Sequence, residues 1–310
     1  MAIRVGVIGV GYLGRHHARI YSEMNSAQLY AVIDSDKAKA EEIARQYNSK
    51  AYTDYRSALD SLQALSIVTP TTSHYDIALE CLKQGKDILI EKPIAHTVKK
   101  ADMLIEEAGK KGLLLQVGHL ERYNPAVVSA SRFISEPLFF EAERVSPFSE
   151  RAKDVDVTID LMIHDIDIIL SFLKYPNVKK LNASGGRIMT DKLDFASAWL
   201  EFQGGASAFI RASRVSEDTS RKLRIYEKDS YLLIDYQRQE IKKFLKTGKE
   251  ISVEQTSLPP KEPLKEELRD FIDCVLKRTK PMVSAVEARN ALQMAIKITN
   301  KIKTKDTTKI

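Results

Sequence analysis

Cysteine is scarce in this sequence of 310 residues, which contains only Cys81 and Cys274. Two cysteines in a chain of this length do not make a disulfide framework, so we expect a reducing, cytoplasmic location. No run of about 18 apolar residues is present, so no membrane-spanning helix is predicted. Glycines interrupt the apolar N-terminal segment, which also lacks a basic start, so we do not interpret it as a signal peptide.

Neither sign of charge dominates the sequence. It has 48 lysine and arginine residues and 42 aspartate and glutamate residues, interleaved along the chain. We therefore expect no nucleic-acid partner and no membrane partner. Separately, a chain of this length is sufficient for two domains. Five lysines lie between Lys297 and Lys309. A solvated helix end explains them, and an anion-binding arm is the alternative.

The first part of the chain alternates between two periodicities. Short apolar runs predict buried strands at 3–8, 28–33, 65–69, 87–90 and 113–117. Helical patterning lies between them, at about 14–24, 36–47, 73–84 and 97–111. This alternation predicts a Rossmann-type α/β domain over residues 1–122, with a parallel sheet that is covered on both faces.

The pattern changes in the second part, residues 123–310. One apolar helix is predicted over 157–174, and six strand-like runs follow between 178 and 245 with no helix between them. Gly204 and Gly205 indicate a hairpin turn. Helices return at about 263–278 and 284–303. We predict an α+β domain with an open, largely antiparallel sheet, and the C-terminal helix is an element that could pack back on the first domain.

Gly9, Gly11 and Gly14 form a GxGxxG motif between the first strand and the first helix. In this context the first glycine permits a tight turn, the second lets backbone amides approach a pyrophosphate, and the third allows close packing of helix on strand. The N-terminus of the helix offers N–H groups to the phosphates. The motif predicts a dinucleotide site, and a glycine turn in some other α/β protein is the alternative.

Asp34 follows the second strand, twenty residues after Gly14. A carboxylate at this position accepts hydrogen bonds from the adenosine ribose and repels a 2′-phosphate. Because Ser35 and Asp36 provide no arginine to offset that repulsion, we predict NAD as the cofactor. Lys37 keeps NADP open as the alternative.

Lys92 stands at the end of an apolar strand, where ligands of open α/β sheets bind. It is a candidate to hydrogen-bond a ribose or substrate hydroxyl near the nicotinamide, so it is a candidate for cofactor contact as well as for catalysis. A solvated surface lysine is the alternative. Pro93 follows it, and the sequence does not decide whether that peptide bond is cis. Further candidates for cofactor contact lie in the glycine loop or after strand ends: Tyr12, Leu13, Thr69, Pro70, Thr71, His74, Glu91 and His119.

Asp160 and His164 lie four residues apart on the predicted helix, so they share a face. Oxidation of an alcohol needs a base for the hydroxyl proton, and histidine titrates nearest neutrality. We therefore expect His164 to be the base and Asp160 to bind the substrate or to orient the imidazole. A core histidine paired with an acid is the alternative. A metal site is not expected, because no second histidine or cysteine lies at ligand spacing.

The remaining histidines are weaker candidates. His16 and His17 follow the glycine loop and are positioned to touch phosphate, and His96 is expected at the surface. His119 follows the strand at 113–117, close to the expected nicotinamide position.

Taken together, GVIGVGYLG, Asp34, VTPTTSH, GKDILIEKP, VGHLERYNPA and DLMIHDID resemble the Gfo/Idh/MocA oxidoreductase family over essentially the whole chain. The resemblance implies a catalytic set of Lys92, Asp160 and His164. It also implies an open C-terminal sheet with one face over the active site and the other pairing subunits. We therefore expect a homo-oligomer, either a dimer or a tetramer, and the alternating strand runs agree with an exposed second face.

Within that family, VGHLERYNPA and DLMIHDID are most similar to members that oxidise the 3-hydroxyl of UDP-N-acetylglucosamine for lipid A synthesis. This predicts a UDP-sugar substrate, with Arg122 on the diphosphate and Tyr123 on a ring face. Packing at the domain junction is the alternative for both residues. Glu217 and Asp218 place acids where a diphosphate loop would be basic. The competing functions are oxidation of a free sugar or cyclitol and a non-catalytic, NAD-bound regulatory role.

Overall fold

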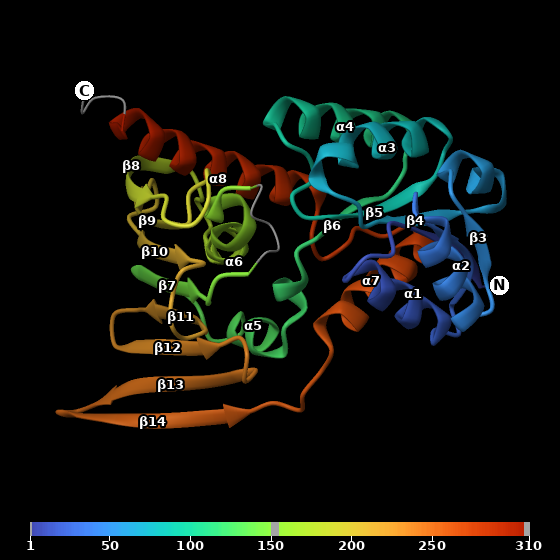
Figure 1. Ribbon diagram of the computed structural model, residues 1–310. Coiled ribbons are helices and arrows are strands. Elements are labelled where there is room, and N and C mark those ends of the chain that lie inside the picture. The colour runs from blue at the N-terminus through green and yellow to red at the C-terminus, as the bar shows by residue number, and fades with distance from the viewer. Residues whose placement is uncertain (1, 150–154, 307–310) are drawn as a thin grey trace. The chain divides into compact units, whose positions relative to one another are not determined.

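The computed structural model describes residues 2–149 and 155–306, which form two compact units (Figure 1). The first unit comprises Met1–Leu120 and Glu262–Arg289, and the second comprises Glu121–Lys261 and Asn290–Ile310. The segment Glu262–Arg289, which was expected in the second domain, therefore clusters with the first unit. No helix of the described residues is long and apolar enough to span a membrane.

The first unit contains a six-stranded sheet in the order β3-β2-β1-β4-β5-β6, and every neighbouring pair is parallel. Its strands are β1 (Ile3–Ile8), β2 (Ala27–Ile33), β3 (Lys50–Tyr52), β4 (Ala64–Ile67), β5 (Asp87–Glu91) and β6 (Leu115–Gly118). Its helices are α1 (Gly14–Ser22), α2 (Lys37–Gln46), the 3₁₀ helix η1 (Tyr55–Ser61), α3 (Thr71–Lys83), α4 (Val98–Lys111) and α7 (Pro263–Lys277). The predicted Rossmann sheet is confirmed, and β3 is an additional edge strand that was too short and too exposed to give a pattern.

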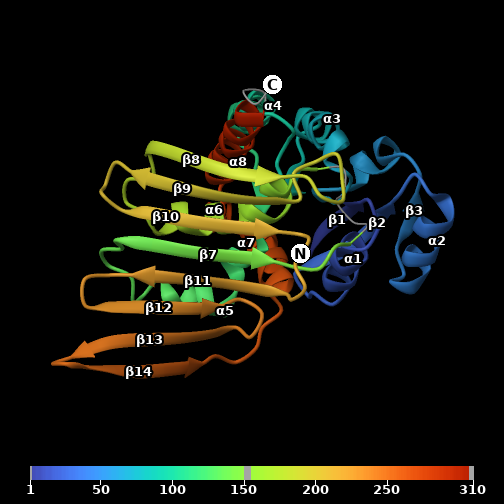
Figure 2. The same cartoon turned by 60° about the vertical axis from the view of Figure 1, so that its left-hand side comes forward.

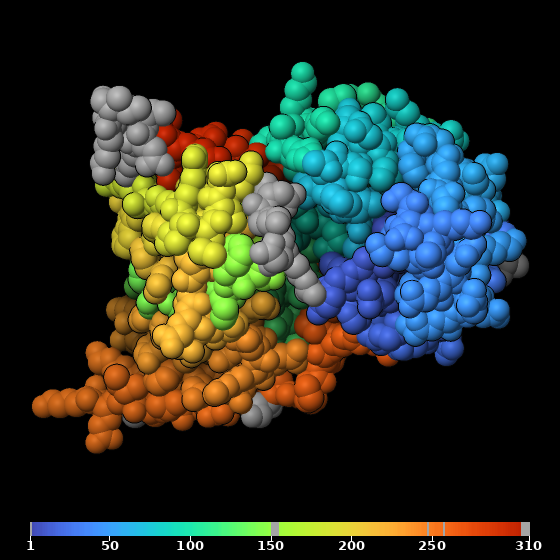
Figure 3. Space-filling view, in the orientation of Figure 1, coloured from blue at the N-terminus to red at the C-terminus, as the bar shows by residue number. Residues whose placement is uncertain are grey.

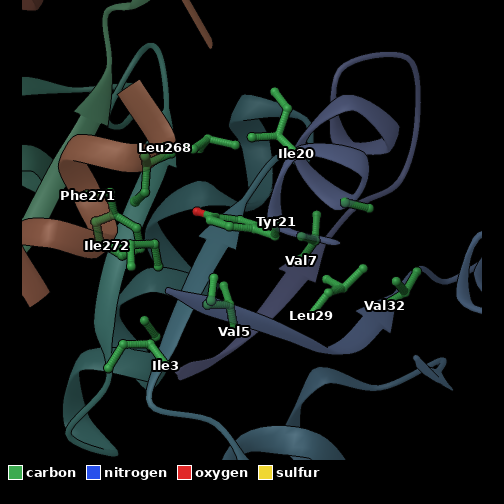
Figure 4. Packing of buried hydrophobic residues seen from close by; sticks show 14 of the residues in the cluster. Ile3, Val5, Val7, Ile20, Tyr21, Leu29, Val32, Leu268, Phe271 and Ile272 are labelled. Atoms are coloured by element: carbon green, nitrogen blue, oxygen red, sulfur yellow. The ribbon is translucent and has the colours of Figure 1, made fainter. Parts of the chain in front are cut away.

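The core of this unit brings together segments that are far apart in the sequence. Val5 and Val7 of β1, Tyr21 of α1 and Phe271 of α7 belong to one buried cluster (Figure 4). The Tyr21 hydroxyl, inside this cluster, lies 2.7 Å from the hydroxyl of Ser66, so its polar atom is satisfied. Helix α7 therefore covers the sheet beside α1, although more than 240 residues separate it from β1.

The second unit contains an eight-stranded sheet in the order β14-β13-β12-β11-β7-β10-β9-β8. Its strands are β7 (Phe139–Val145), β8 (Val178–Gly186), β9 (Phe195–Phe202), β10 (Ser207–Ser213), β11 (Ser220–Tyr226), β12 (Ser230–Asp235), β13 (Glu240–Thr247) and β14 (Glu250–Ser257). Among the described strands of this sheet only β7 and β10 pair in parallel, so the prediction of a largely antiparallel sheet is confirmed. The predicted hairpin turn is also present, with Gly205 at φ 93°.

Helices cover one face of this sheet (Figure 2). The additional elements of the chain are the 3₁₀ helix η2 (Leu120–Tyr123), α5 (Pro125–Ala130), the π-helical turn η3 (Thr158–Met162), α6 (Ile163–Phe172) and α8 (Ala285–Asp306). Both η3 and α6 pack on β7 and β10, and α5 packs on β12 and β13. The covered face carries small buried residues such as Ala142, Ala198 and Ala212, which let the helices approach closely.

The opposite face of the sheet carries a row of aromatic side chains. Phe139 lies 5.5 Å from Trp199 and 5.8 Å from Tyr226 between ring centroids, and Tyr231 stacks on Phe244 at 4.1 Å. We call Phe139, Trp199, Tyr226, Tyr231 and Phe244 the aromatic row. The β13–β14 hairpin (orange) projects from this unit in Figure 3.

Candidate functional site

All six strands of the first sheet end at one edge because they are parallel, and this edge carries the candidate cofactor residues. A pocket of about 460 Å³ lies there within the first unit. Its lining includes the predicted residues Gly9, Gly11, Asp34, Thr69 and Pro70. Binding at the carboxyl ends of the strands is the rule for open α/β sheets.

The glycine loop has the geometry that the motif predicts. Gly9 adopts φ 87°, and a Cβ on it would lie 2.6 Å from the Val68 carbonyl oxygen. A Cβ on Gly14 would lie 1.8 Å from the Gly9 carbonyl oxygen, so only glycine lets α1 begin this close to β1. A Cβ on Gly11, in contrast, would meet no atom within 4 Å. Open space at the middle glycine fits a loop whose backbone approaches a phosphate group.

Asp34 is held in place by backbone amides. Its Oδ2 accepts a hydrogen bond from Val10 N and its Oδ1 from Asp36 N, both at 2.9 Å. The carboxylate is therefore fixed between the glycine loop and the start of α2, where Asp36 caps the helix. The pocket also includes Thr53 and Tyr55, which sequence reasoning missed. They follow β3, so recognising that short strand would have identified them.

The end of β5 combines a half-buried lysine with a buried acid. Lys92 is half-buried, and its peptide bond to Pro93 is cis. Glu91 is buried, and its Oε1 lies 3.2 Å from His17 Nε2 of α1. His17 itself is fully buried, so the expectation that it touches phosphate is wrong. The Glu91 carboxylate also fills the space over Gly118, where a Cβ would lie 2.7 Å from Oε1.

The other predicted cofactor residues divide into exposed and buried ones. Tyr12 is 60% exposed beside His16, with their ring centroids 5.5 Å apart, and His119 is buried. His74 is also buried, and its ring nitrogens lie 2.9 Å from the Pro93 carbonyl oxygen and 2.8 Å from that of Thr69. Burial lowers the pKa of His74, and the two carbonyl oxygens oppose that shift. His74 therefore ties the ends of β4 and β5 together. Leu13 and Thr71 lie at the starts of α1 and α3.

In the second unit, Asp160 and His164 come from two consecutive helical segments and not from one α-helix. Asp160 lies in the π turn η3, and His164 lies in the first turn of α6. Single π turns occur often at functional sites, and apolar periodicity does not reveal them. Both residues are half-buried, so both are accessible to a ligand.

The other two acids of this segment are buried in ion pairs. The guanidinium of Arg144 lies 2.8 Å from Asp165 and 2.9 Å from Glu121, and all three side chains are buried. Asp167 lies 3.3 Å from Arg122. Because a buried charge needs a partner, these acids have a structural role. The two half-buried residues, Asp160 and His164, are therefore the candidates for chemistry.

The network around Arg144 also contains residues that were not predicted. The Arg144 guanidinium lies 5.0 Å from the centre of the Tyr236 ring, and burial raises the pKa of the Tyr236 phenol. Asn124 donates a hydrogen bond to the Tyr236 carbonyl oxygen at 2.9 Å. Tyr123, a predicted substrate residue, is also buried, at 4% exposure. No sequence signal identifies these partners, because Tyr236 lies in the turn after β12 and Asn124 caps α5, more than 100 residues earlier.

Two sequence profiles match the chain. The profile described as "Oxidoreductase family, NAD-binding Rossmann fold" matches residues 3–119, and that of the GFO/IDH/MocA C-terminal domain matches residues 130–230. Together they cover the glycine loop, the end of β5 and the η3–α6 segment.

Several known proteins are similar over nearly the whole length. UDP-N-acetylglucosamine 3-dehydrogenase from Acidithiobacillus ferrooxidans is 33% identical over 303 residues, which is 96% of each chain. Its solved structure superposes with a TM-score of 0.93 over 98% of this chain and 99% of that one. scyllo-Inositol 2-dehydrogenase (NAD⁺) from Bacillus subtilis is 28% identical over 96% of this chain and 93% of its own. Levoglucosan dehydrogenase, solved with NADH and levoglucosan, shares the fold at 19% identity with a TM-score of 0.89 over 98% of each chain.

Proposed function

This chain belongs to the Gfo/Idh/MocA family of NAD-binding oxidoreductases, and we propose that it oxidises the 3-hydroxyl of UDP-N-acetylglucosamine to a ketone. The observation that carries the choice of substrate is the similarity to the A. ferrooxidans enzyme, which extends over 96% of both chains. The chemical support is that Asp160 and His164 are half-buried and so can be reached by a ligand, whereas Asp165 and Asp167 of the same segment are buried.

The proposed cofactor site uses the strand-end pocket of the first unit. The glycine loop receives the pyrophosphate at the start of α1, and Asp34 receives the adenosine ribose. Bound there, NAD supplies the acceptor for the hydride that leaves the sugar carbon. The fit rests on the open space at Gly11 and on the fixed carboxylate of Asp34.

The proposed proton transfer uses His164. Its imidazole takes the proton of the reacting hydroxyl, a role for which a group that titrates near neutrality is suited. Asp160 binds the substrate or orients the imidazole, and Lys92 donates a hydrogen bond to the oxygen as charge develops on it. His119 keeps its proposed place near the nicotinamide. Glu91 remains a candidate for cofactor contact, and its burial against His17 favours a structural role.

Arg122 and Tyr123 are proposed to bind the nucleotide part of the substrate. The ion pair of Arg122 with Asp167 and the burial of Tyr123 favour the competing role, which is packing. Arg122→Ala separates the two roles. Binding predicts a higher KM for the nucleotide sugar at unchanged stability, whereas packing predicts a lower midpoint of urea unfolding.

Oxidation of a free cyclitol is the second candidate, favoured by the 28% identity to the B. subtilis scyllo-inositol dehydrogenase. The test is NADH formation from UDP-N-acetylglucosamine, from free N-acetylglucosamine and from scyllo-inositol, each with a ketone trap. The proposed function predicts NADH from the UDP-sugar. Turnover of the cyclitol with no response to the UDP-sugar would move the assignment to the second candidate.

Three further proposals concern the biological setting. We propose that the 3-keto product serves lipid A synthesis, after an aminotransferase replaces the ketone, and that the enzyme works in the cytoplasm. We also propose a homo-oligomer, either a dimer or a tetramer, built on the aromatic row. That row places five large rings on the sheet face opposite the one that carries η3 and α6.

A further inference from the structure

Arg221 of the second unit lies on the helix-covered face of the sheet and is nevertheless exposed to solvent. Arg221 of β11 lies directly opposite Arg144 of β7 in the antiparallel register. Directly opposed side chains point to the same face of a sheet. Arg221 therefore shares the face of Arg144 and of Leu223 and Ile225, which are all buried. Arg221, in contrast, is exposed to solvent.

Neighbouring arginines are already engaged by acids. Arg122 lies 3.3 Å from Asp167, Arg214 lies 3.5 Å from Asp194, and Arg224 lies 3.5 Å from Glu141. Across residues 2–149 and 155–306, the Arg221 side chain makes no hydrogen bond and no ion pair. It is therefore a cation of this face whose donors remain available for a ligand.

Charges of both signs surround Arg221. Desolvation, followed by the positive charge of Arg144 directly opposite, lowers the pKa of Arg221. The carboxylates of Glu121, Asp165 and Asp160 act in the opposite direction, but the first two are already paired with Arg144. Arginine stays protonated in proteins despite such shifts. An anion bound to Arg221 would supply the acceptors that its N–H donors lack among the described residues.

We propose that Arg221 binds the phosphate attached to the sugar of the substrate and so selects phosphorylated sugars over free ones. This inference rests on the proposed oxidation of UDP-N-acetylglucosamine. Asp160 is assigned to the same sugar ring, and its segment η3 packs on β7, the strand that pairs with β11 at Arg221. The guanidinium donates two parallel N–H groups to phosphate oxygens, a geometry that a free cyclitol does not match.

The test compares Arg221→Ala with Arg238→Ala. Arg238 is an exposed arginine in the turn between β12 and β13, and its side chain also makes no ion pair within the described residues. Loss of a charged hydrogen bond predicts that Arg221→Ala raises the KM for UDP-N-acetylglucosamine about 10- to 100-fold, with a much smaller change in kcat. The KM for NAD and the unfolding midpoint stay near wild type, and Arg238→Ala matches wild type in every measurement.

Two further substrates identify the source of the phosphate. N-acetylglucosamine 1-phosphate carries the phosphate without the nucleoside, and free N-acetylglucosamine carries neither. The inference predicts that Arg221→Ala lowers kcat/KM for both phosphorylated sugars and leaves the free sugar unchanged. The phosphorylated sugar that wild type prefers is the natural source.

Three results would overturn the inference. The first is an Arg221→Ala variant with wild-type KM for UDP-N-acetylglucosamine, which leaves the proposed function intact. The second is a fall in kcat at unchanged KM, because it would show that Arg221 acts through Asp160 and not on the phosphate. The third is wild-type enzyme that oxidises scyllo-inositol but no phosphorylated sugar, which would remove both the inference and the proposed function.

Discussion

The candidate cofactor residues of the first unit follow the carboxyl ends of parallel strands, whereas the candidate acid/base residues of the second unit lie on a π turn and the helix after it. Gly9, Asp34 and Lys92 each come directly after a strand, so their positions follow from the topology of the sheet. Asp160 and His164 are instead distinguished by burial, because both are half-buried whereas Asp165 and Asp167 are buried. The candidates of the first unit are thus found at the strand ends of a parallel sheet. Those of the second unit are found as the polar residues of a largely buried helical segment that remain partly exposed.

The largest expected effect is a loss of kcat that leaves NAD affinity unchanged. We predict that His164→Ala and Lys92→Ala each lower kcat by about 10²- to 10⁴-fold, because each removes a group that we propose to act on the reacting hydroxyl. NAD affinity, measured by titration calorimetry, stays near wild type in both variants. The exposed residues His96 and Lys99 provide matched controls as His96→Ala and Lys99→Ala. A near-normal rate in either test variant would remove that residue from the mechanism.

The buried network of the second unit predicts a stability effect. Arg144→Met leaves Glu121 and Asp165 buried without their cation, which typically costs about 3–5 kcal/mol. Urea unfolding, followed by circular dichroism, measures the change. Arg224→Met, at an ion pair on the other face of the sheet, should cost less than about 1 kcal/mol. Equal losses in the two variants would contradict the structural role assigned to the network.

In the first unit, Asp34→Ala tests the basis of cofactor choice. Removal of the carboxylate would abolish both the proposed ribose contact and the proposed repulsion of a 2′-phosphate. We expect the preference for NAD over NADP to fall by about tenfold, in line with the roughly 1.5 kcal/mol of one charged hydrogen bond. Titrations of both cofactors against wild type and variant measure this ratio. Equal or tighter binding of NADP by the wild-type enzyme would contradict the assignment of Asp34.

The smallest effect on turnover is expected at the aromatic row. Tyr226→Glu places a charge among the rings of the exposed sheet face, so we expect the oligomer to dissociate, with the activity of the separated subunits changing little. Light scattering gives the mass of wild type and variant across a range of concentrations. A wild-type protein that is a monomer at every concentration would refute this assembly.

The sequence predicted most of the first unit, although it placed α7 in the second domain, and it predicted the second unit only in outline. The five apolar runs that form β1, β2, β4, β5 and β6 are local patterns, so periodicity and motif spacing were sufficient. In the second unit, β7 was missed because Arg144 puts a charge on the buried face of the strand, beside Phe140 and Ala142. Its partners Glu121 and Asp165 are distant in sequence. The inward position of His17 in α1 was also missed because its partner is distant in sequence: Glu91 lies at the end of β5.

The measurement that tests the central claim most directly is a single-turnover assay with enzyme, NAD and UDP-N-acetylglucosamine, in which absorbance reports NADH and a carbonyl reagent traps the product. We predict NADH in proportion to the enzyme active sites, a trapped 3-keto sugar, and loss of both with His164→Ala. An absence of NADH from the UDP-sugar under trapping, while scyllo-inositol is oxidised under the same conditions, would contradict the claim.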